Sequence, residues 1–170
     1  PMTPESSSSS MCVNCRSAGA RLTCPLCSEP VCSKCAERPP QGAFRHMHPV
    51  PQDLKHLHYC PPCYASHIEP ALEKYAETLE LAKQVFVFYV TQRKQIPLIK
   101  KAKETLRISE GEDRDEIILT LAYMAAEKGY NALVECDVKS VKVRNEGWQH
   151  SVWSGSAVPA MIDAEKMDRY

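Results

Sequence analysis

A periodic run of apolar residues in the middle of the chain predicts a helix. Apolar side chains recur within residues 66–84 at steps of four and three positions, and side chains at these steps share one helical face. The residues of this stripe are Ile68, Leu72, Tyr75, Leu79 and Ala82, and Phe86 continues the series. Ser66 is expected to cap the helix and Pro70 to lie in its first turn. We therefore predict a linking helix over residues 67–84. It packs its stripe on a neighbouring domain or, alternatively, forms a short coiled coil between two chains.

Strand and helix signals alternate within residues 85–162, which predicts a compact α+β domain. Residues 85–91 are β-branched and aromatic, as is typical of a strand. A short helical stretch is expected over Leu98–Leu106, and a turn or helix cap over Ser109–Glu112. Residues 113–128 then carry an apolar helical face behind an acidic first turn, and a glycine follows as the C-terminal cap.

The domain is expected to end in an antiparallel hairpin. Apolar and polar residues alternate over residues 132–138, and the phase of this alternation changes after Ser140, which suggests a β-bulge. Asn145-Glu146-Gly147 is typical of a hairpin turn, and the returning strand is expected to begin at Trp148. Trp148 and Trp153 lie on opposite faces of that strand, so at least one of them is expected outside the main core.

The N-terminal third of the chain has no such periodicity. Residues 1–10 are polar and contain a serine run, so they are expected to form a disordered tail, and residues 163–170 are assigned to a C-terminal tail. Residues 11–66 are rich in Cys, Pro and His and can build only a small core. Structural zinc can contribute about 10–16 kcal/mol to the folding of such a segment. We therefore expect metal ions to hold residues 11–66 together.

Cysteines are concentrated in this segment. Eight of the nine cysteines in the 170-residue chain lie in four CxxC pairs. The pairs are Cys12/Cys15, Cys24/Cys27, Cys32/Cys35 and Cys60/Cys63. A CxxC turn presents two thiolates to one ion, and two such turns complete a closed tetrahedral zinc site. The four pairs therefore predict two zinc ions per chain, each held by four cysteines with no position left for a catalytic water.

The order in which the pairs combine has two solutions. Only four residues separate Cys27 from Cys32, which makes their two pairs awkward partners for one ion. We favour an interleaved arrangement over a sequential one that joins the first two pairs and the last two. The first zinc is then held by Cys12, Cys15, Cys32 and Cys35, and the second by Cys24, Cys27, Cys60 and Cys63. Disulfides are a further alternative, which we do not favour because no stretch resembles a secretion signal.

The cysteine-rich segment resembles a known family. The CxxC-x4-CxxC core, the order of the pairs and the ending Tyr59-Cys60-Pro61-Pro62-Cys63-Tyr64 are similar to a FYVE-type zinc finger, over residues 12 to about 67. The resemblance implies a small cross-brace zinc finger over residues 11–66. A RING finger fits less well, because its third and fourth ligands are normally a Cys and a His. FYVE fingers that read phosphatidylinositol 3-phosphate carry a basic R-(R/K)-H-H-C-R run, which here is Ala-Arg-Leu-Thr-Cys-Pro with only Arg21 in place. The resemblance therefore implies a protein-binding module rather than a lipid reader.

The C-terminal domain resembles a second family. The string from Ala125 to Val134 and the later Gly155-Ser156-Ala157-Val158 are similar to motifs of the YbjQ-like family, in which a helix ends in A-x-x-x-G-A-N-A-V and a strand in G-T-A-V. This resemblance covers roughly residues 84–160. It implies a small α+β fold that assembles as a ring in some relatives.

Other chemistry-bearing residues carry weaker signals. The insert between the third and fourth pairs holds His46, His48, His56 and His58, which are either a further metal or pH-sensitive site or part of a solvated, Pro-rich loop. We favour the loop, because the eight cysteines already complete two sites. Cys136 lies in an apolar alternation and is expected to be a small buried residue, too far along the hairpin from His150 to share an ion.

Charge and motif content narrow the function classes. The net charge is zero, and residues 11–66 carry six Lys/Arg against three Asp/Glu, so nucleic acid is not an expected partner. No catalytic triad, nucleophile elbow or phosphate loop is present, and the longest apolar run is far shorter than the ~20 residues of a membrane span. We expect a cytoplasmic, non-enzymatic zinc-binding adaptor with a protein partner. Its C-terminal domain would serve as a binding or oligomerisation module and form a dimer or a ring. The alternative is a peripheral membrane protein that recognises a phosphoinositide headgroup through the finger.

Overall fold

The computed structural model describes residues 11–92 and 95–167. The chain divides into two compact units. The first, called here the finger unit, takes in Pro1–Arg45 and Pro49–Tyr75, and the second, called the sheet unit, takes in His46–His48 and Ala76–Tyr170. The tail predicted for residues 1–10 lies outside the described residues. Within the predicted C-terminal tail, Ala164–Met167 form the short helix α4.

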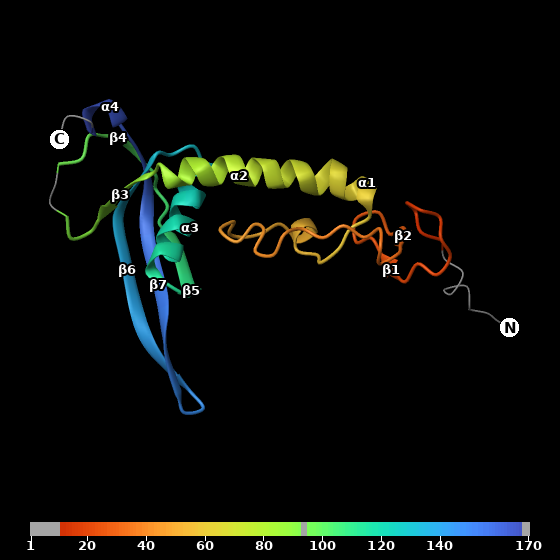
Figure 1. Cartoon of the computed structure of the whole chain (residues 1–170). Helices are drawn as coiled ribbons and strands as arrows, with labels where there is room; N and C mark the ends of the chain where they lie inside the picture. The colour runs from red at the N-terminus through yellow and green to blue at the C-terminus, as the bar shows by residue number, and fades with distance from the viewer. Residues whose placement is uncertain (1–10, 93–94, 168–170) are drawn as a thin grey trace. The chain divides into compact units, whose positions relative to one another are not determined.

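The finger unit contains little regular structure besides its helix (Figure 1). Strands β1 (Leu22–Thr23) and β2 (Pro30–Val31) pair antiparallel, with Leu22 opposite Val31. A single 3-10 turn, η2 (Gln52–Leu54), interrupts the insert between the third and fourth cysteine pairs. A lone antiparallel bridge between Glu37 and Tyr59 closes the base of this insert.

Cysteines make up much of the core of the finger unit. Cys12, Cys24 and Cys60 are buried, and only two of the other residues in this cluster, Ala20 and Val31, are buried with them. These five small residues, together with Phe44, Tyr59 and Ile68 elsewhere in the described part of the unit, exclude too little apolar surface from water to hold a segment of this length. The finger unit therefore depends on whatever links its sulfurs.

The helix of the finger begins earlier than predicted. It starts as α1 (Pro61–Cys63), continues as a π-helical turn, η3 (Tyr64–Ile68), and becomes α2 (Glu69–Lys83). Ser66 therefore does not cap it; its hydroxyl instead donates to the carbonyl of Cys63 at 3.4 Å. The physical reason lies in the two prolines at the first helical positions, which need no N–H partner and have a pre-set φ.

The predicted apolar stripe is the more buried face of this helix. Ile68 and Ala82 are buried, and Leu72, Tyr75 and Leu79 are partly buried, whereas most residues between them are exposed. Phe86 lies outside the helix, in strand β3. The helix is thus shared between the units, since the boundary between them falls after Tyr75.

The sheet unit has an α+β fold, as predicted, built on a mixed five-stranded sheet (Figure 1). Its elements are β3 (Phe86–Tyr89), β4 (Leu98–Lys101), β5 (Leu106–Gly111), α3 (Arg114–Glu127), β6 (Ala132–Asn145), β7 (Trp148–Ile162) and α4. The strand order is β3-β6-β7-β4, and β5 also pairs with β7. β3 runs parallel to β6, and all other pairs are antiparallel.

Helix α3 forms where it was predicted and packs on β5, β6 and β7. The carboxylate of Asp113 caps its first turn by accepting from the N–H of Glu116 at 2.7 Å. Its C-terminus is followed by Gly129 at φ +88°, a left-handed conformation that suits glycine. Ile117 is fully buried and lies over Gly111 and Gly155, where added Cβ atoms would come within 2.2 and 2.5 Å of its side chain.

Two predictions in the sheet unit are wrong. Leu98–Leu106 is not helical, because Leu98–Lys101 form β4 and pair with the end of β7. Of the turn or cap expected over Ser109–Glu112, the first three residues instead end β5, and Glu112 follows the strand. Leu106 and Ile108 of this strand are buried, and Arg107 is exposed. The lysine-rich residues around β4 favour a helix by local propensity. The edge of β7 that faces away from β6, however, has backbone N–H and C=O groups that only another strand can pair.

The hairpin forms as predicted, but its bulge lies elsewhere. Glu146 and Gly147 both have positive φ, 49° and 84°, and join β6 to β7 as a two-residue turn of the type favoured in hairpins. The register shifts between Val134 and Asp137, with Glu135 at φ +55°, and it is regular after Ser140, where the bulge was predicted.

The change of phase after Ser140 has a different cause. Val138 pairs with Gly155 and lies beneath Ile117, whereas Val141 pairs with Val152 on the opposite face and is 59% exposed. The apolar positions therefore change face along an uninterrupted strand. Trp148 is 78% exposed, which confirms that at least one tryptophan of β7 lies outside the core.

Candidate metal centres

All four CxxC segments adopt the same backbone turn. In each, the N–H of the residue after the second cysteine donates to the carbonyl of the first cysteine. The bonds are Arg16 to Cys12 at 2.9 Å, Ser28 to Cys24 at 2.8 Å, Ala36 to Cys32 at 3.0 Å and Tyr64 to Cys60 at 2.9 Å. A turn closed in this way carries both of its thiols close together, as a shared ion requires.

The first two turns are closed a second time. The N–H of Cys12 donates to the carbonyl of Ser17, and that of Cys24 to Glu29, both at 2.9 Å. Arg16 and Ser28, which follow these turns, have φ of 64°. Each turn thus closes on itself at a residue with a left-handed backbone, so hydrogen bonds within the turn position its two cysteines.

Backbone contacts bring the remaining turns alongside. The N–H of Val13 donates to the carbonyl of Pro30 at 2.8 Å, which places the first turn beside β2, the strand that leads into Cys32. Glu37 and Tyr59 exchange two backbone bonds of 2.8 and 2.9 Å. Since Cys60 follows Tyr59 directly, this bridge places the fourth turn close to the third, which ends just before Glu37.

The eight cysteines gather in two groups of four whose sulfurs all lie within 4.8 Å of one another. The groups are Cys12, Cys15, Cys32 and Cys35, called here the first group, and Cys24, Cys27, Cys60 and Cys63, the second group. The first group combines the first and third CxxC turns, and the second group combines the second and fourth. The turns of the two groups therefore alternate along the chain, which is the interleaved order. All nine cysteines of the chain are free thiols.

The sulfur spacing fits a tetrahedral ion. The Sγ atoms of Cys15 and Cys32 are 3.7 Å apart, and those of Cys27 and Cys60 are 3.6 Å apart. Zinc–sulfur bonds of about 2.3 Å at tetrahedral angles separate two sulfurs by about 3.8 Å. Each group could therefore hold one metal ion with four cysteine ligands.

The thiols of the first group differ in acidity. The backbone N–H of Cys15, against the opposing effect of burial, lowers the pKa of Cys12 to about 6. At Cys35 the side chain of Asn14 lowers the pKa, but the neighbouring sulfurs of Cys32 and Cys15 outweigh it and raise the pKa to about 11. Thiolates this close repel one another, so a group without a cation keeps some of its protons.

The second group shows the same division. At Cys24 burial raises the pKa, but backbone N–H groups, that of Cys60 foremost, outweigh it and lower the pKa to about 6. Burial raises the pKa of both Cys60 and Cys63. A divalent cation among the four sulfurs would favour the thiolate at every position, so the donor set of each group suits a cation better than protons.

Two polar side chains that sequence reasoning missed border the first group. The side-chain amide of Asn14 donates to Cys35 Sγ at 3.3 Å, and Ser17 Oγ lies 2.9 Å from Cys15 Sγ. Both residues lie within or just after the first CxxC turn. A polar side chain inside or just after a CxxC turn is the sequence signal by which these two residues could have been identified.

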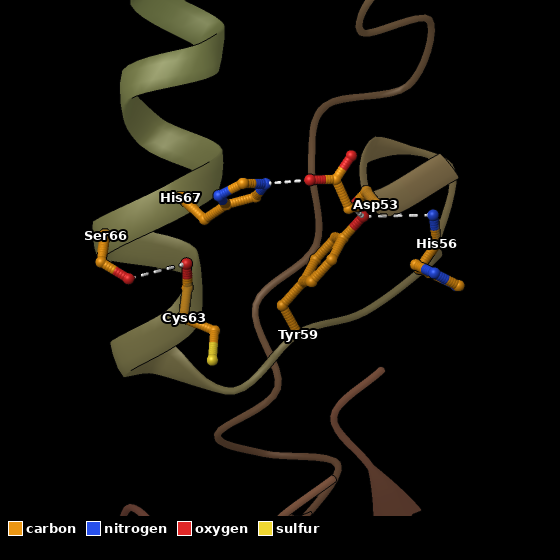
Figure 2. Close-up of polar contacts among 6 residues, drawn as sticks. All are labelled: Asp53, His56, Tyr59, Cys63, Ser66 and His67. Carbon is orange, nitrogen blue, oxygen red and sulfur yellow. Dashed lines mark hydrogen bonds and ion pairs between the residues drawn. The ribbon is translucent and has the colours of Figure 1, made fainter. Parts of the chain in front are cut away.

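A polar latch ties the insert to the helix that carries Cys63 (Figure 2). The hydroxyl of Tyr59, a fully buried residue, donates to the carbonyl of Asp53 at 2.7 Å and accepts from the N–H of His56 at 3.1 Å. The carboxylate of Asp53 pairs with Nε2 of His67 on η3. Burial is the main reason why the pKa of Tyr59 is raised. Sequence reasoning assigned no role to these residues.

Tyr59→Phe is expected to lower the free energy of unfolding of the metal-loaded finger unit by about 1–2 kcal/mol. The substitution keeps the buried ring but leaves the Asp53 carbonyl and the His56 N–H without their partner. The measurement is chemical denaturation of the full chain followed by tyrosine near-UV circular dichroism. Tyr64→Phe is the matched control, since its ring lies 6.5 Å from that of Tyr59 in the same segment. An equal loss in the control would contradict the role of the latch.

The histidines of the insert do not form a third site. Among residues 11–92 and 95–167, the two cysteine groups are the only sets of three or more His, Cys, Asp or Glu side chains that could share an ion. Cys136 is buried beside β3, and burial raises its pKa to about 11. His150 pairs with Val143, seven positions along β6 from Cys136. No helix in the described part of the chain has the length and apolar character of a membrane span.

Comparison of the chain with protein-family models, with curated proteins and with solved structures found no match. The resemblances to FYVE-type fingers and to the YbjQ-like family therefore stay predictions from the sequence. The geometry of the two cysteine groups stands independently of them.

Proposed function

We propose that the finger unit binds two zinc ions, one in each cysteine group, and that the chain is a non-enzymatic adaptor. The proposal of zinc binding rests on one observation, that eight free thiols lie in two groups with tetrahedral sulfur spacing. Four thiolates in a tetrahedron favour zinc over magnesium and calcium, which prefer oxygen ligands.

The proposed role of the zinc ions is structural. Each group offers four protein ligands, so no coordination position is left for a water or a substrate. The first zinc would join the turn at Cys12 to the turn that follows β2, and the second would join the turn after β1 to the start of α1. The two ions would thus replace the apolar core that the finger unit lacks.

The surface of the finger unit favours a protein as its binding partner. The insert forms a groove of about 550 Å³, lined in part by Pro39, Ala43, Phe44, Val50, Leu54 and Leu57. Leu57 is 82% exposed at its edge. An exposed apolar side chain beside an apolar groove is typical of a protein-binding surface. A phosphoinositide headgroup is less favoured, because only Arg21 matches the basic run of lipid-reading fingers.

The sheet unit would supply self-association. The end of the β6–β7 hairpin is exposed on both faces, and Val141, Val143 and Trp148 are its large exposed apolar residues. Apolar residues on a two-stranded arm favour burial against another chain, and tryptophan is enriched in such contacts. A dimer or ring would repeat the finger and strengthen weak partner contacts through multivalency.

Native mass spectrometry of the full chain tests both parts in one spectrum. We expect two zinc ions per chain and a mass corresponding to two or more chains. Replacing Trp148 by Ser should lower the assembly state and leave the zinc count at two. Fewer than two zinc ions per chain would overturn the metal assignment, and a monomer at tens of micromolar would overturn the self-association.

Liposome pelleting with and without phosphoinositides is the companion experiment. Salt-sensitive retention on the liposomes would favour recognition of a lipid headgroup over a protein partner.

A further inference from the structure

Asn14 contacts the sulfurs of both turns that form the first group. Its backbone N–H points to Cys12 Sγ at 3.4 Å, and its side-chain Nδ2 donates to Cys35 Sγ at 3.3 Å. Cys12 belongs to the first CxxC turn and Cys35 to the third, 21 residues from Asn14. One residue thus fastens the two halves of the group to each other independently of any ion.

The second group has no counterpart of this side chain. Asn14 is the third residue of its CxxC turn, and the same position in the turns of the second group holds Leu26 and Pro62. Neither side chain has an N–H or O–H group that could donate to a sulfur. The two groups therefore share their ligands and their turn geometry but differ in this donor.

The difference bears on metal retention. A zinc ion with four thiolates carries a net charge of two minus, and an N–H that donates to a sulfur disperses part of that charge and fixes the ligand's orientation. Removing such a partner of a metal ligand typically lowers metal affinity by about 10–100-fold. The loss is local, because the donor reaches only one site.

We propose that Asn14 is a positioning residue of the first group, whose side-chain amide holds Cys35 in place for the metal and makes the two zinc sites unequal. This inference rests on the proposed function, since it requires that both groups bind zinc. It assigns to Asn14 a role in one site only. Removal of its amide should release metal from the first group and leave the second group loaded.

The experiment compares the full chain with Asn14→Ala and Asn14→Asp. Asn14→Asp retains the side-chain shape but replaces the amide donor by a carboxylate that repels the thiolates. The matched control is Lys34→Ala, since Lys34 is exposed and takes the third position in the other CxxC turn of the same group. The zinc-loaded proteins are titrated with a chelator, exposed cysteines are alkylated at each step, and mass spectrometry maps which of the eight are modified.

The expected result is specific to one group. In Asn14→Ala, alkylation of Cys12, Cys15, Cys32 and Cys35 should occur at a 10–100-fold lower chelator concentration than in the unmodified chain. Asn14→Asp should lose metal from the same four at least as readily, while the second group and the Lys34→Ala protein stay unchanged. Equal loss from both groups, or no difference between Asn14→Ala and Lys34→Ala, would overturn the proposal. A chain that binds no zinc before any substitution would instead overturn the proposed function.

Discussion

Removal of the metal from the full chain is expected to unfold the finger unit and to leave the sheet unit folded. Structural zinc contributes about 10–16 kcal/mol in small fingers, which equals or exceeds the whole stability of a typical domain. The finger has no other comparable source of stability, because its cysteine cluster buries only Ala20 and Val31 besides three cysteines, and Phe44, Tyr59 and Ile68 are the other buried apolar residues in its described part. The sheet unit holds its own core of buried residues from β3, β6 and β7, which contains no ligand of either group.

Hydrogen exchange read by mass spectrometry measures this result region by region. After an excess of chelator, amides of residues 11–60 should exchange at the rate of an unfolded chain, while those of β6 and β7 keep their protection. Acid should act in the same direction, because the ligands bind as thiolates and protons compete with the metal for them. The control is Cys136→Ser, which removes a buried thiol of the sheet unit and should leave the metal dependence of the finger unchanged. Unchanged protection of residues 11–60 without metal would contradict the prediction.

Gly155→Ala is expected to destabilise the sheet unit by about 1–3 kcal/mol through overpacking. A Cβ atom at this position would lie 2.5 Å from Cγ2 of Ile117 and 3.2 Å from Cγ2 of Val138. Ile117 is fully buried between α3 and the sheet, so its side chain cannot turn away without displacing others. Thermal denaturation followed by far-UV circular dichroism measures the loss.

A double-mutant cycle shows whether the contact with Ile117 is the cause. Ile117→Ala alone should cost about 2–5 kcal/mol by leaving a cavity. The pair Gly155→Ala and Ile117→Ala should cost less than the sum of the single changes, because the new methyl group enters that cavity. Ser154→Ala is the control, since Ser154 pairs with Lys139 on the opposite face of β7 and should change stability little. Strict additivity of the pair would contradict the packing explanation.

Much of the candidate metal site could be predicted from short stretches of sequence. A CxxC turn is closed by hydrogen bonds within six residues, so its ability to hold two thiols is a local property, and all four turns have the expected form. The interleaved order followed from a second local limit, the four residues between Cys27 and Cys32. The contact of the Asn14 amide with Cys35 and the pairing of Asp53 with His67 in the latch could not be predicted in this way, because their partners lie 21 and 14 residues apart in the chain.

The same division holds in the sheet unit. Helix α3 and the turn at Glu146-Gly147 are determined by a capping carboxylate, a periodic apolar face and a glycine at positive φ, all of which act within one or two turns of chain. The strands β4 and β5 were missed, because their own residues favour other conformations and their hydrogen bonds come from β7, about 40 to 65 residues later.

The sequence by itself determined the cysteine turns, the main helix of each unit and the hairpin, because each depends on interactions between residues close in the chain. The tertiary structure decided which strands complete the sheet, where β6 bulges, where the finger helix begins and which donors reach the sulfurs. Long-range pairing decides such features because a buried backbone group must find a hydrogen-bond partner, and local preference is weaker than the cost of leaving it without one.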